Sequence, residues 1–201
     1  MSKTVTREYD KNGNMIYEKE SKCLEKWFDY DLNNNLVHYK KSNRSEKWYY
    51  YDSNGNLIHT KDSDGYKEWK EYDYNNNLTH YKNSFKYEKW YNYDSNGNCI
   101  YTINSDGEEE WNSYDDKGNR IHHEVSYGFE CWFDYDSNGN TIHLKLHNGF
   151  ECWYNYDDKG NCIHSKNSHG IEFWYEYDDN GNVIYEKDST GNETKYNNIY
   201  N

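Results

Sequence analysis

Aromatic and polar residues alternate along the chain in short runs, and the runs return at a fixed interval. A Tyr-Asp pair recurs every 21 residues, nine times in succession, from Tyr9-Asp10 to Tyr177-Asp178. A fixed period of this length is typical of a repeat protein, in which one supersecondary unit is stacked many times. A residue type that recurs in one column is explained first by the repeat itself, so function has to be sought in surfaces and in departures from the pattern.

The third unit, residues 46–65, has the pattern of a β-hairpin. Its sequence is E-K-W-Y-Y-Y-D-S-N-G-N-L-I-H-T-K-D-S-D-G. An aromatic strand comes first, and Asn54-Gly55 is a strong signal for a tight hairpin turn. A second strand follows, and a further turn at Asp64-Gly65 returns the chain. Each repeat is therefore predicted to contribute two antiparallel strands.

The turn columns support hairpins in the other units as well. The position of Gly55 is Gly in seven repeats and Asn in the other two, Asn34 and Asn76, and both residue types tolerate the positive φ of a type I′ turn. The column that follows is Asn in all nine units. These residues predict a two-residue loop at the first turn of every repeat.

The two loops predict a definite register of cross-strand pairs. A two-residue loop at Asn54-Gly55 places Tyr51 opposite Ile58, Tyr49 opposite Thr60 and Trp48 opposite Lys61. A three-residue loop over residues 64–66 places Ile58 beside Tyr72 and Lys61 beside Trp69. The two registers are mutually consistent and reproduce the 21-residue period.

Alternation along each strand sorts the columns onto two faces of the predicted sheet. One face carries the Tyr51 column and the aromatic ring at position 49 and its equivalents, and we predict that this face forms the core. The Ile58 column is assigned to the same face, with Ile16, Val37, Ile100, Ile121, Ile142, Ile163 and Ile184. The other face carries Trp, His, Lys, Glu, Asp and Ser.

The predicted fold class is all-β, with tandem 21-residue β-hairpin repeats that form a continuous antiparallel meander or solenoid sheet. A parallel β-helix with one rung per repeat is the alternative. That fold would stack the Asp and Glu columns about 4.8 Å apart, and like charges directly opposite each other are destabilising. The hairpin meander doubles that spacing and places Lys-bearing strands between the acidic ones, so it is favoured.

The whole chain, residues 1–201, is predicted to be one repeat domain of about nine units. Thr6 and Lys195 take the place of Trp in the first and last strands. Polar residues at the ends are what capping a solenoid requires. We therefore expect the chain to be a complete protein rather than a fragment.

Composition limits the partners that the chain can bind. Its hydrophobic content is only 33%, but an aromatic content of 19% argues against disorder. The formal net charge of −13 disfavours direct binding of duplex nucleic acid, which needs clusters of Lys and Arg. An acidic surface suits a basic protein partner, or mimicry of nucleic acid toward a protein that binds it. A homodimer is compatible with this composition.

The sequence gives no sign of export or of membrane insertion. The first residues contain no apolar segment of the kind found in signal peptides, and no stretch is long and apolar enough to span a bilayer. We therefore expect a cytoplasmic protein without a membrane partner. The five cysteines, Cys23, Cys99, Cys131, Cys152 and Cys162, are interpreted as free thiols, because residues that share a column lie too far apart for a disulfide.

A column of histidines offers the most obvious candidate chemistry: His38, His59, His80, His122, His143 and His164. Its members are separated by about two strands, too far to share one metal ion, and we interpret them as a ladder of solvated side chains. The turn Asp52-Ser53-Asn54-Gly55-Asn56 lacks the downstream Glu of a calcium loop. No catalytic residues, metal site or cofactor are expected, and the chain is predicted not to be an enzyme.

The Trp column is the candidate partner-binding surface. It consists of Trp27, Trp48, Trp69, Trp90, Trp111, Trp132, Trp153 and Trp174. A structural interpretation packs each Trp on the stems of neighbouring Lys residues. A functional interpretation treats the column as a binding platform, since exposed aromatic residues on a rigid sheet often dominate interface energy.

The unit G-x-x-E-x-W-x-x-Y-D-x-x-G-N-x-I resembles the YD repeat of the RHS family, and the resemblance covers residues 4–198. It implies a sheet-like scaffold of the kind that encloses bacterial toxins, although about nine units are few for enclosing anything. The run W-Y-Y-Y-D-S-N-G-N also resembles choline- and glucan-binding wall repeats. Those repeats carry Gly-Trp on the second strand, where this chain has Ile-His.

From these observations we expect a non-enzymatic β-repeat scaffold that binds a basic protein partner, with inhibition of that partner as one outcome. Antitoxins, immunity proteins and nuclease inhibitors are the functional classes that fit a small acidic protein with this resemblance. The alternative is a carbohydrate or cell-wall binding repeat module. The lack of a signal peptide at the start of the chain counts against that alternative.

Overall fold

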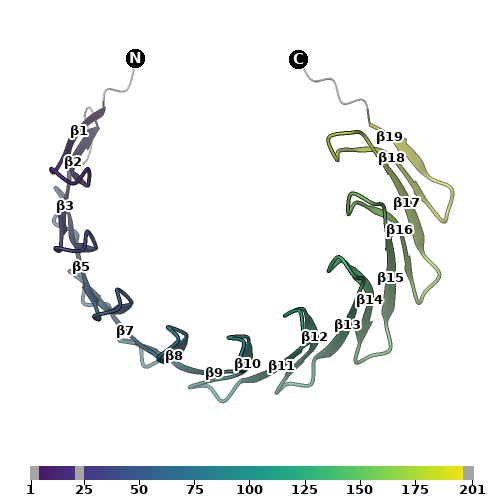
Figure 1. Cartoon of the computed structure of the whole chain (residues 1–201), viewed down its shortest axis with the longest axis horizontal. Helices are drawn as coiled ribbons and strands as arrows, with labels where there is room; N and C mark the ends of the chain where they lie inside the picture. The colour runs from purple at the N-terminus through teal and green to yellow at the C-terminus, as the bar shows by residue number, and fades with distance from the viewer. Residues whose placement is uncertain (1–4, 21–24, 197–201) are drawn as a thin grey trace. The chain divides into compact units, whose positions relative to one another are not determined.

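The computed structural model describes residues 5–20 and 25–196, which form strands and turns without any helix (Figure 1). The first ten strands are β1 (Val5–Tyr9), β2 (Met15–Glu20), β3 (Glu25–Tyr30), β4 (Leu36–Lys41), β5 (Glu46–Tyr51), β6 (Leu57–Asp62), β7 (Lys67–Tyr72), β8 (Leu78–Asn83), β9 (Glu88–Tyr93) and β10 (Cys99–Asn104). The remaining strands are β11 (Glu109–Tyr114), β12 (Arg120–Val125), β13 (Glu130–Tyr135), β14 (Thr141–Leu146), β15 (Glu151–Tyr156), β16 (Cys162–Asn167), β17 (Glu172–Tyr177), β18 (Val183–Asp188) and β19 (Glu193–Lys195). None of the described residues belongs to a helix that could cross a membrane.

The chain divides into two compact units. Unit 1 comprises residues 1–97 and 102–107, and unit 2 comprises residues 98–101 and 108–201. In unit 1 each strand from β1 to β9 pairs antiparallel with the next in the chain. In unit 2 the strands from β11 to β19 do the same. The predicted all-β hairpin meander is confirmed, and the parallel β-helix is excluded. The prediction of one domain over residues 1–201 stays a prediction.

The first turn of each repeat is longer than predicted. In the third unit the amide of Gly55 donates to the carbonyl of Asp52 at 3.2 Å, and the amide of Asp52 donates to the carbonyl of Asn56 at 3.0 Å. Gly55 has a φ of 86°, as expected for a three-residue loop that ends in a left-handed residue. The predicted two-residue turn is therefore wrong, because the loop consists of residues 53–55.

This loop places a β-bulge directly after the turn. Tyr51 pairs with Leu57 and not with Ile58, and Tyr50 then pairs with His59. The predicted pair of Tyr51 with Ile58 is therefore wrong. Beyond the bulge the register agrees with the prediction, since Tyr49 pairs with Thr60 and Trp48 pairs with Lys61.

The second turn was also predicted in the wrong register. Its loop consists of residues 63–65, closed by the amide of Gly65 donating to the carbonyl of Asp62 at 3.3 Å. Lys61 pairs with Lys67 and His59 with Trp69, so the predicted pairs of Lys61 with Trp69 and Ile58 with Tyr72 are wrong. The error for Lys61 is two residues, and a shift of two preserves the face on which each side chain lies.

The bulge moves the Ile58 column away from the predicted core. In a β-bulge two residues lie opposite one, and both side chains point to the same side of the sheet as their partner. Ile58 and His59 therefore lie on the side of Tyr50. Members of the column in unit 2 are exposed by 37–38%, namely Ile121, Ile142 and Ile163. The assignment of this column to the core face is wrong.

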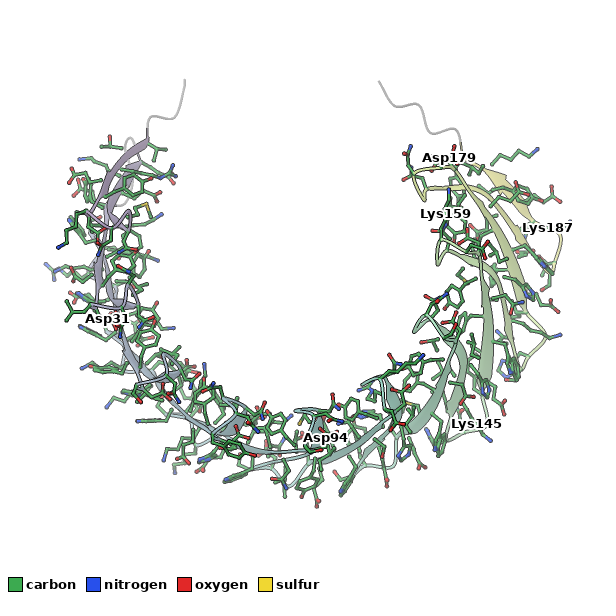
Figure 2. All side chains as sticks on the ribbon, viewed as in Figure 1. Asp31, Asp94, Lys145, Lys159, Asp179 and Lys187 are labelled. Atoms are coloured by element: carbon green, nitrogen blue, oxygen red, sulfur yellow. The ribbon has the colours of Figure 1, made fainter. Side chains whose placement is uncertain are left out.

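The core lies on the Tyr face, which we define as the side that carries Tyr49, Thr60 and their equivalents in the other repeats. All five buried residues among those described lie on it: Glu18, Thr60, Thr102, Val125 and Cys131. Thr60 is exposed by only 1%, between its pairing partners Tyr49 and Glu68. Side chains project from both sides of the sheet without a second layer of strands (Figure 2).

The structure explains why Tyr and Asp recur together. The hydroxyl of Tyr51 donates to the carbonyl of Leu36 in the preceding hairpin at 3.0 Å, and Tyr156 does the same to Thr141 at 2.8 Å. Asp52 Oδ1 accepts the amides of Asn54 and Asn56, at 2.9 and 2.8 Å. The Tyr therefore binds one repeat to the previous repeat, and the Asp closes the turn.

Asn in place of Gly strengthens two of these turns. Asn34 and Asn76 both have a φ of 65°. The side-chain oxygen of Asn76 accepts a hydrogen bond from Asn56 Nδ2 at 2.8 Å, and Asn34 accepts one from Asn14 in the same way. Asn thus tolerates the left-handed conformation and also connects successive turns.

We expect Gly139→Val to lower the free energy of unfolding by about 1–3 kcal/mol, because a β-branched residue is forced to a positive φ. Gly139 has a φ of 87°. A Cβ added there would lie 3.7 Å from its nearest neighbour, Asn119 Oδ1, without a steric clash, so the loss of stability comes from the backbone conformation. Ser137→Val in the same loop is the matched control, with an expected change within about 0.5 kcal/mol. Equal losses for the two variants in urea unfolding would contradict this account of the loop.

Candidate binding face

The opposite side of each sheet, the Trp face, carries all eight tryptophans that were predicted to bind a partner. Each is the third residue of an odd-numbered strand from β3 to β17, so that each hairpin after the first carries one: Trp27, Trp48, Trp69, Trp90, Trp111, Trp132, Trp153 and Trp174. Trp90, Trp153 and Trp174 are exposed by 40%, 39% and 38%. The others are half-buried. The column is accessible, but each ring is held by its neighbours.

Every His of the predicted column stacks on the Trp of the following strand. The six pairs have ring centroids 4.9–5.3 Å apart and interplanar angles of 7–24°. In two other repeats Tyr17 and Tyr101 take the place of His beside Trp27 and Trp111. The His side chains are only 15–25% exposed where they contact carboxylates. The interpretation of this column as a ladder of solvated histidines is therefore wrong.

Carboxylates lie on both sides of several of these imidazoles. His143 Nδ1 is 3.0 Å from Asp134 Oδ2, and His143 Nε2 is 3.0 Å from Glu151 Oε2. His38 lies in the same way between Asp29 and Glu46, at 3.0 and 3.1 Å. Only the doubly protonated ring can donate to both acceptors at once. This arrangement fixes the plane of each imidazole against its Trp.

The glutamates of these rows also contact lysines. Lys166 Nζ is 3.1 Å from Glu172 Oε1, and His164 Nε2 is 2.9 Å from Glu172 Oε2. The hydrogen bond from His164 is the largest cause of the lowered pKa of Glu172, and the corresponding bond from His38 lowers the pKa of Glu46. Many of the Lys, His and Glu side chains on the Trp face are therefore paired with one another.

The acidic residues that lie opposite the histidines remain open to solvent. Asp29, Glu71 and Asp134 have side-chain exposures of 69%, 67% and 70%. They form a column beside the first turns of the repeats. In unit 2 Lys159 and Asp179 lie at this turn edge, while Lys145 and Lys187 lie toward the opposite edge (Figure 2). The aromatic column therefore has exposed carboxylates on the side of the first turns. On its other side lie lysines that pair with the Trp residues and contact glutamates, such as Lys145, Lys166 and Lys187.

Neighbouring hairpins leave shallow hollows between them at this edge. One hollow, of about 710 Å³, lies between β3 and β5. Val37 and His38 line its base, Asp29 lies on one side, and Trp48 and Tyr50 lie on the other. Tyr50 and Asp29 were not among the site residues predicted from the sequence. The available signal was that Tyr50 is the only aromatic residue in its column, where the other repeats carry Glu, Asp, Asn or Ser.

His122, Glu124 and Glu130 form a cluster of groups that could hold a metal ion, with ligand atoms within 4.8 Å of one another. His122 Nε2 is already 2.8 Å from Glu130 Oε1, and this pair repeats the His–Glu contact of the other hairpins. The cluster therefore follows from the repeat. That the chain has no metal, cofactor or catalytic residue stays a prediction.

The described cysteines Cys99, Cys131, Cys152 and Cys162 are free thiols, and Cys23 lies outside the described residues. Burial raises the pKa of Cys131 and of Cys162. Both thiols are therefore more weakly acidic than an ordinary cysteine, which disfavours the reactive thiolate.

Comparison with known proteins gives a family match and a shared fold. The sequence model described as Teneurin YD-shell matches residues 64–201. No curated protein matches the chain. Among solved structures, the Tc holotoxin pore of Photorhabdus luminescens is similar with a TM-score of 0.74 at 15% identity, over 95% of this chain and 13% of that one. The TcdB2–TccC3 crystal structure has a TM-score of 0.63 at 13% identity, over 96% of this chain.

A third structure, TcdB2–TccC3–Cdc42, has a TM-score of 0.63 at 13% identity and is matched over 92% of this chain. The chain spans only 13–14% of the length of these three solved chains. At such low identity, the similarity shows a shared fold. The match to the Teneurin YD-shell model confirms the resemblance to YD repeats that the Tyr-Asp period indicated.

Proposed function

Because the chain belongs to the Teneurin YD-shell family, we propose that it is a non-enzymatic repeat scaffold whose Trp face binds a basic cytoplasmic protein. The observation that carries this proposal is the ordered row of stacked His and Trp rings in repeat after repeat. A ring that is already immobilised loses little conformational entropy when a partner covers it. A row of such rings on a sheet offers aromatic anchors of the kind that dominate interface energy.

Electrostatics favour a basic partner over a neutral one. The chain has a formal net charge of −13, and the exposed carboxylates of Asp29, Glu71 and Asp134 lie beside the aromatic column. Complementary charge speeds association and excludes acidic competitors. The Lys, His and Glu side chains that pair with one another on the Trp face add little net attraction for a partner. The exposed carboxylates of Asp29, Glu71 and Asp134 therefore determine the sign of the surface charge.

The class of partner that we propose is a basic component of a toxin system, with this chain as an immunity protein or inhibitor. Solved proteins with the same fold include a Tc holotoxin pore and TcdB2–TccC3 assemblies. Inhibition would follow if the Trp face covered a functional basic surface of the partner.

We expect capture of the basic partner from a host lysate at about 0.05 M salt and a marked loss at about 0.5 M, since the Debye length falls toward about 4 Å. The captured protein is then purified, and its association and dissociation rates are measured. The double variant Trp69→Ala, Trp90→Ala, at two successive hairpins of unit 1, is expected to raise the dissociation rate at least tenfold, because it removes two anchors while leaving the net charge unchanged.

Tyr74→Ser is the matched control. Tyr74 is 90% exposed in a first-turn loop, outside the strands that carry the Trp column, and Ser occupies the same column in other repeats. It is expected to leave the dissociation rate unchanged. An equal effect of Tyr74→Ser would contradict the assignment of the Trp face. Salt-insensitive capture of a polysaccharide on a glycan array would favour the carbohydrate-binding alternative instead.

A further inference from the structure

The hollow between β3 and β5 departs from the repeat in a way that changes its chemistry. Tyr50 is exposed by 42% and introduces an aromatic ring where the other repeats have a polar side chain. With Trp48 it gives the hollow two aromatic residues on one side, and Asp29 lies on the other. Asp31 and Asp52, from two successive turns, also line it, and their carboxylates accept hydrogen bonds within those turns.

The rings of Trp48 and Tyr50 both contact a cation, Lys61, from the side of β6. Lys61 of β6 lies over Trp48, with Nζ 5.0 Å from the ring centroid, and over Tyr50 at 5.9 Å. His59 of the same strand stacks on Tyr50 at 5.2 Å. None of the residues that line the hollow comes from β6, so the hollow lies on the other side of β5 from Lys61 and His59.

Two of the aspartates around the hollow have lowered pKa values. Hydrogen bonds from the backbone and side chain of Asn35 lower the pKa of Asp31, and the side chain of Asn56 is the largest cause of the lowered pKa of Asp52. Asp29 faces His38 Nδ1 through Oδ2 at 3.0 Å and keeps 69% of its side chain exposed. An aromatic wall opposite carboxylates is complementary to a flat cation, which stacks on a ring through its face and donates hydrogen bonds through its edge.

We propose that this hollow binds the guanidinium group of an arginine side chain in a basic protein segment. The proposal rests on the proposed function and supplies its recognition chemistry. Arginine fits better than lysine, because its planar group can stack on Tyr50 while its N–H groups reach a carboxylate such as Asp29. Trp48 lies beside this position with its ring already stacked on His38. A neutral sugar would stack on Tyr50 in the same way but would gain nothing from the carboxylate charges.

Unit 2 contains a natural comparison for this hollow. Five repeats further along, Asp134, His143 and Trp153 occupy the positions of Asp29, His38 and Trp48, and His143 has the same two carboxylate contacts. The main difference is Asn155 in the position of Tyr50. A single exchange in each direction can therefore remove the arginine site from one repeat and create it in another.

The test uses the full chain labelled with 5-fluorotryptophan, which gives each Trp its own ¹⁹F resonance. The Trp48 and Trp153 resonances are assigned with Trp48→Phe and Trp153→Phe. Titration with Nα-acetylarginine methylamide is expected to shift the Trp48 resonance saturably and to leave the Trp153 resonance unchanged. Tyr50→Asn is expected to weaken binding at Trp48 by about fivefold to tenfold, and Asn155→Tyr is expected to make the Trp153 resonance respond with a similar Kd.

Nα-acetylcitrulline methylamide, which keeps the shape of arginine without its charge, is expected to shift neither resonance. Equal responses of all the Trp resonances, or an unchanged response in Tyr50→Asn, would overturn the proposal. A larger shift of Trp48 with chito-oligosaccharides than with the arginine compound would assign the hollow to sugars instead. Failure to capture a basic partner while the arginine response persists would refute the proposed function alone.

Discussion

Tyr156→Ala is expected to lower the free energy of unfolding by about 2–4 kcal/mol, among the largest effects of any single change in unit 2. Tyr156 lies half-buried on the Tyr face, and burial is the largest cause of its raised pKa. Its hydroxyl donates to the carbonyl of Thr141 in the preceding hairpin at 2.8 Å. The substitution removes both the ring and the hydrogen bond that joins two successive repeats. Urea unfolding followed by circular dichroism measures the loss.

Tyr156→Phe separates the two contributions. It keeps the ring and deletes only the hydroxyl, so a loss of about 0.5–1.5 kcal/mol is expected. Tyr127→Ala, at a turn residue that is 76% exposed, is the control and is expected to change stability by less than about 0.5 kcal/mol. If Tyr156→Phe were as damaging as Tyr156→Ala, the ring would contribute nothing, which is contrary to the structure. Neighbouring repeats stabilise each other, so the urea transition of Tyr156→Ala is also expected to broaden.

Acid is expected to destabilise the whole protein between about pH 4 and pH 2, because the same carboxylate bond recurs in the turns. Hydrogen bonds from the Asn four residues later lower the pKa of the turn aspartates Asp10, Asp31, Asp52, Asp115, Asp136 and Asp157. In the second turn of the last repeat, bonds from Thr190 and then Asn192 lower the pKa of Asp188 to about 2. The native state therefore binds fewer protons than the unfolded state in this range.

The sign of the effect follows from that difference. Each lowered pKa contributes stability that is fully present above the unfolded pKa, near 4, and is lost as the pH falls through the folded pKa. The midpoint of urea unfolding is expected to fall steadily from pH 4.5 to pH 2.5 at constant ionic strength. The double variant Asp136→Asn, Asp157→Asn is expected to flatten this dependence, whereas Asp158→Asn, at an exposed residue of the same turn as Asp157, is not. A midpoint that does not change with pH would show that the turn aspartates contribute nothing to stability.

The sequence by itself determined the repeat and the two antiparallel strands of each unit. The Tyr-Asp period placed every hairpin, because a column that returns every 21 residues has to return to an equivalent place in a stack. Alternation within the first strand separated Tyr49 from Trp48 correctly, since successive side chains in a strand point to opposite faces. The family also followed from these residues.

The length of the first loop could not be predicted from the residue pattern. Asn-Gly favours a two-residue turn, but a three-residue loop also requires a left-handed residue at the position of Gly55, so Gly fits both. The three-residue loop is distinguished by the hydrogen bonds that the carboxylate of Asp52 accepts from the backbone amide and the side chain of Asn56, four residues later. The Asn that follows this left-handed turn residue in all nine repeats was its signal, and it can be interpreted only once the loop geometry is known.

Only the tertiary structure decided which residues form the candidate site. The bulge moved Ile58 to the Trp face, and period-2 alternation cannot show this because a bulge adds one residue without changing the hydrophobic pattern. The stacking of His143 on Trp153 depends on the register between two strands, and the hollow at Tyr50 depends on side chains from three strands. Contacts between strands are set by loop closure and packing. The residue types along one strand therefore determined the hairpins, while the geometry between hairpins determined the surface that they present.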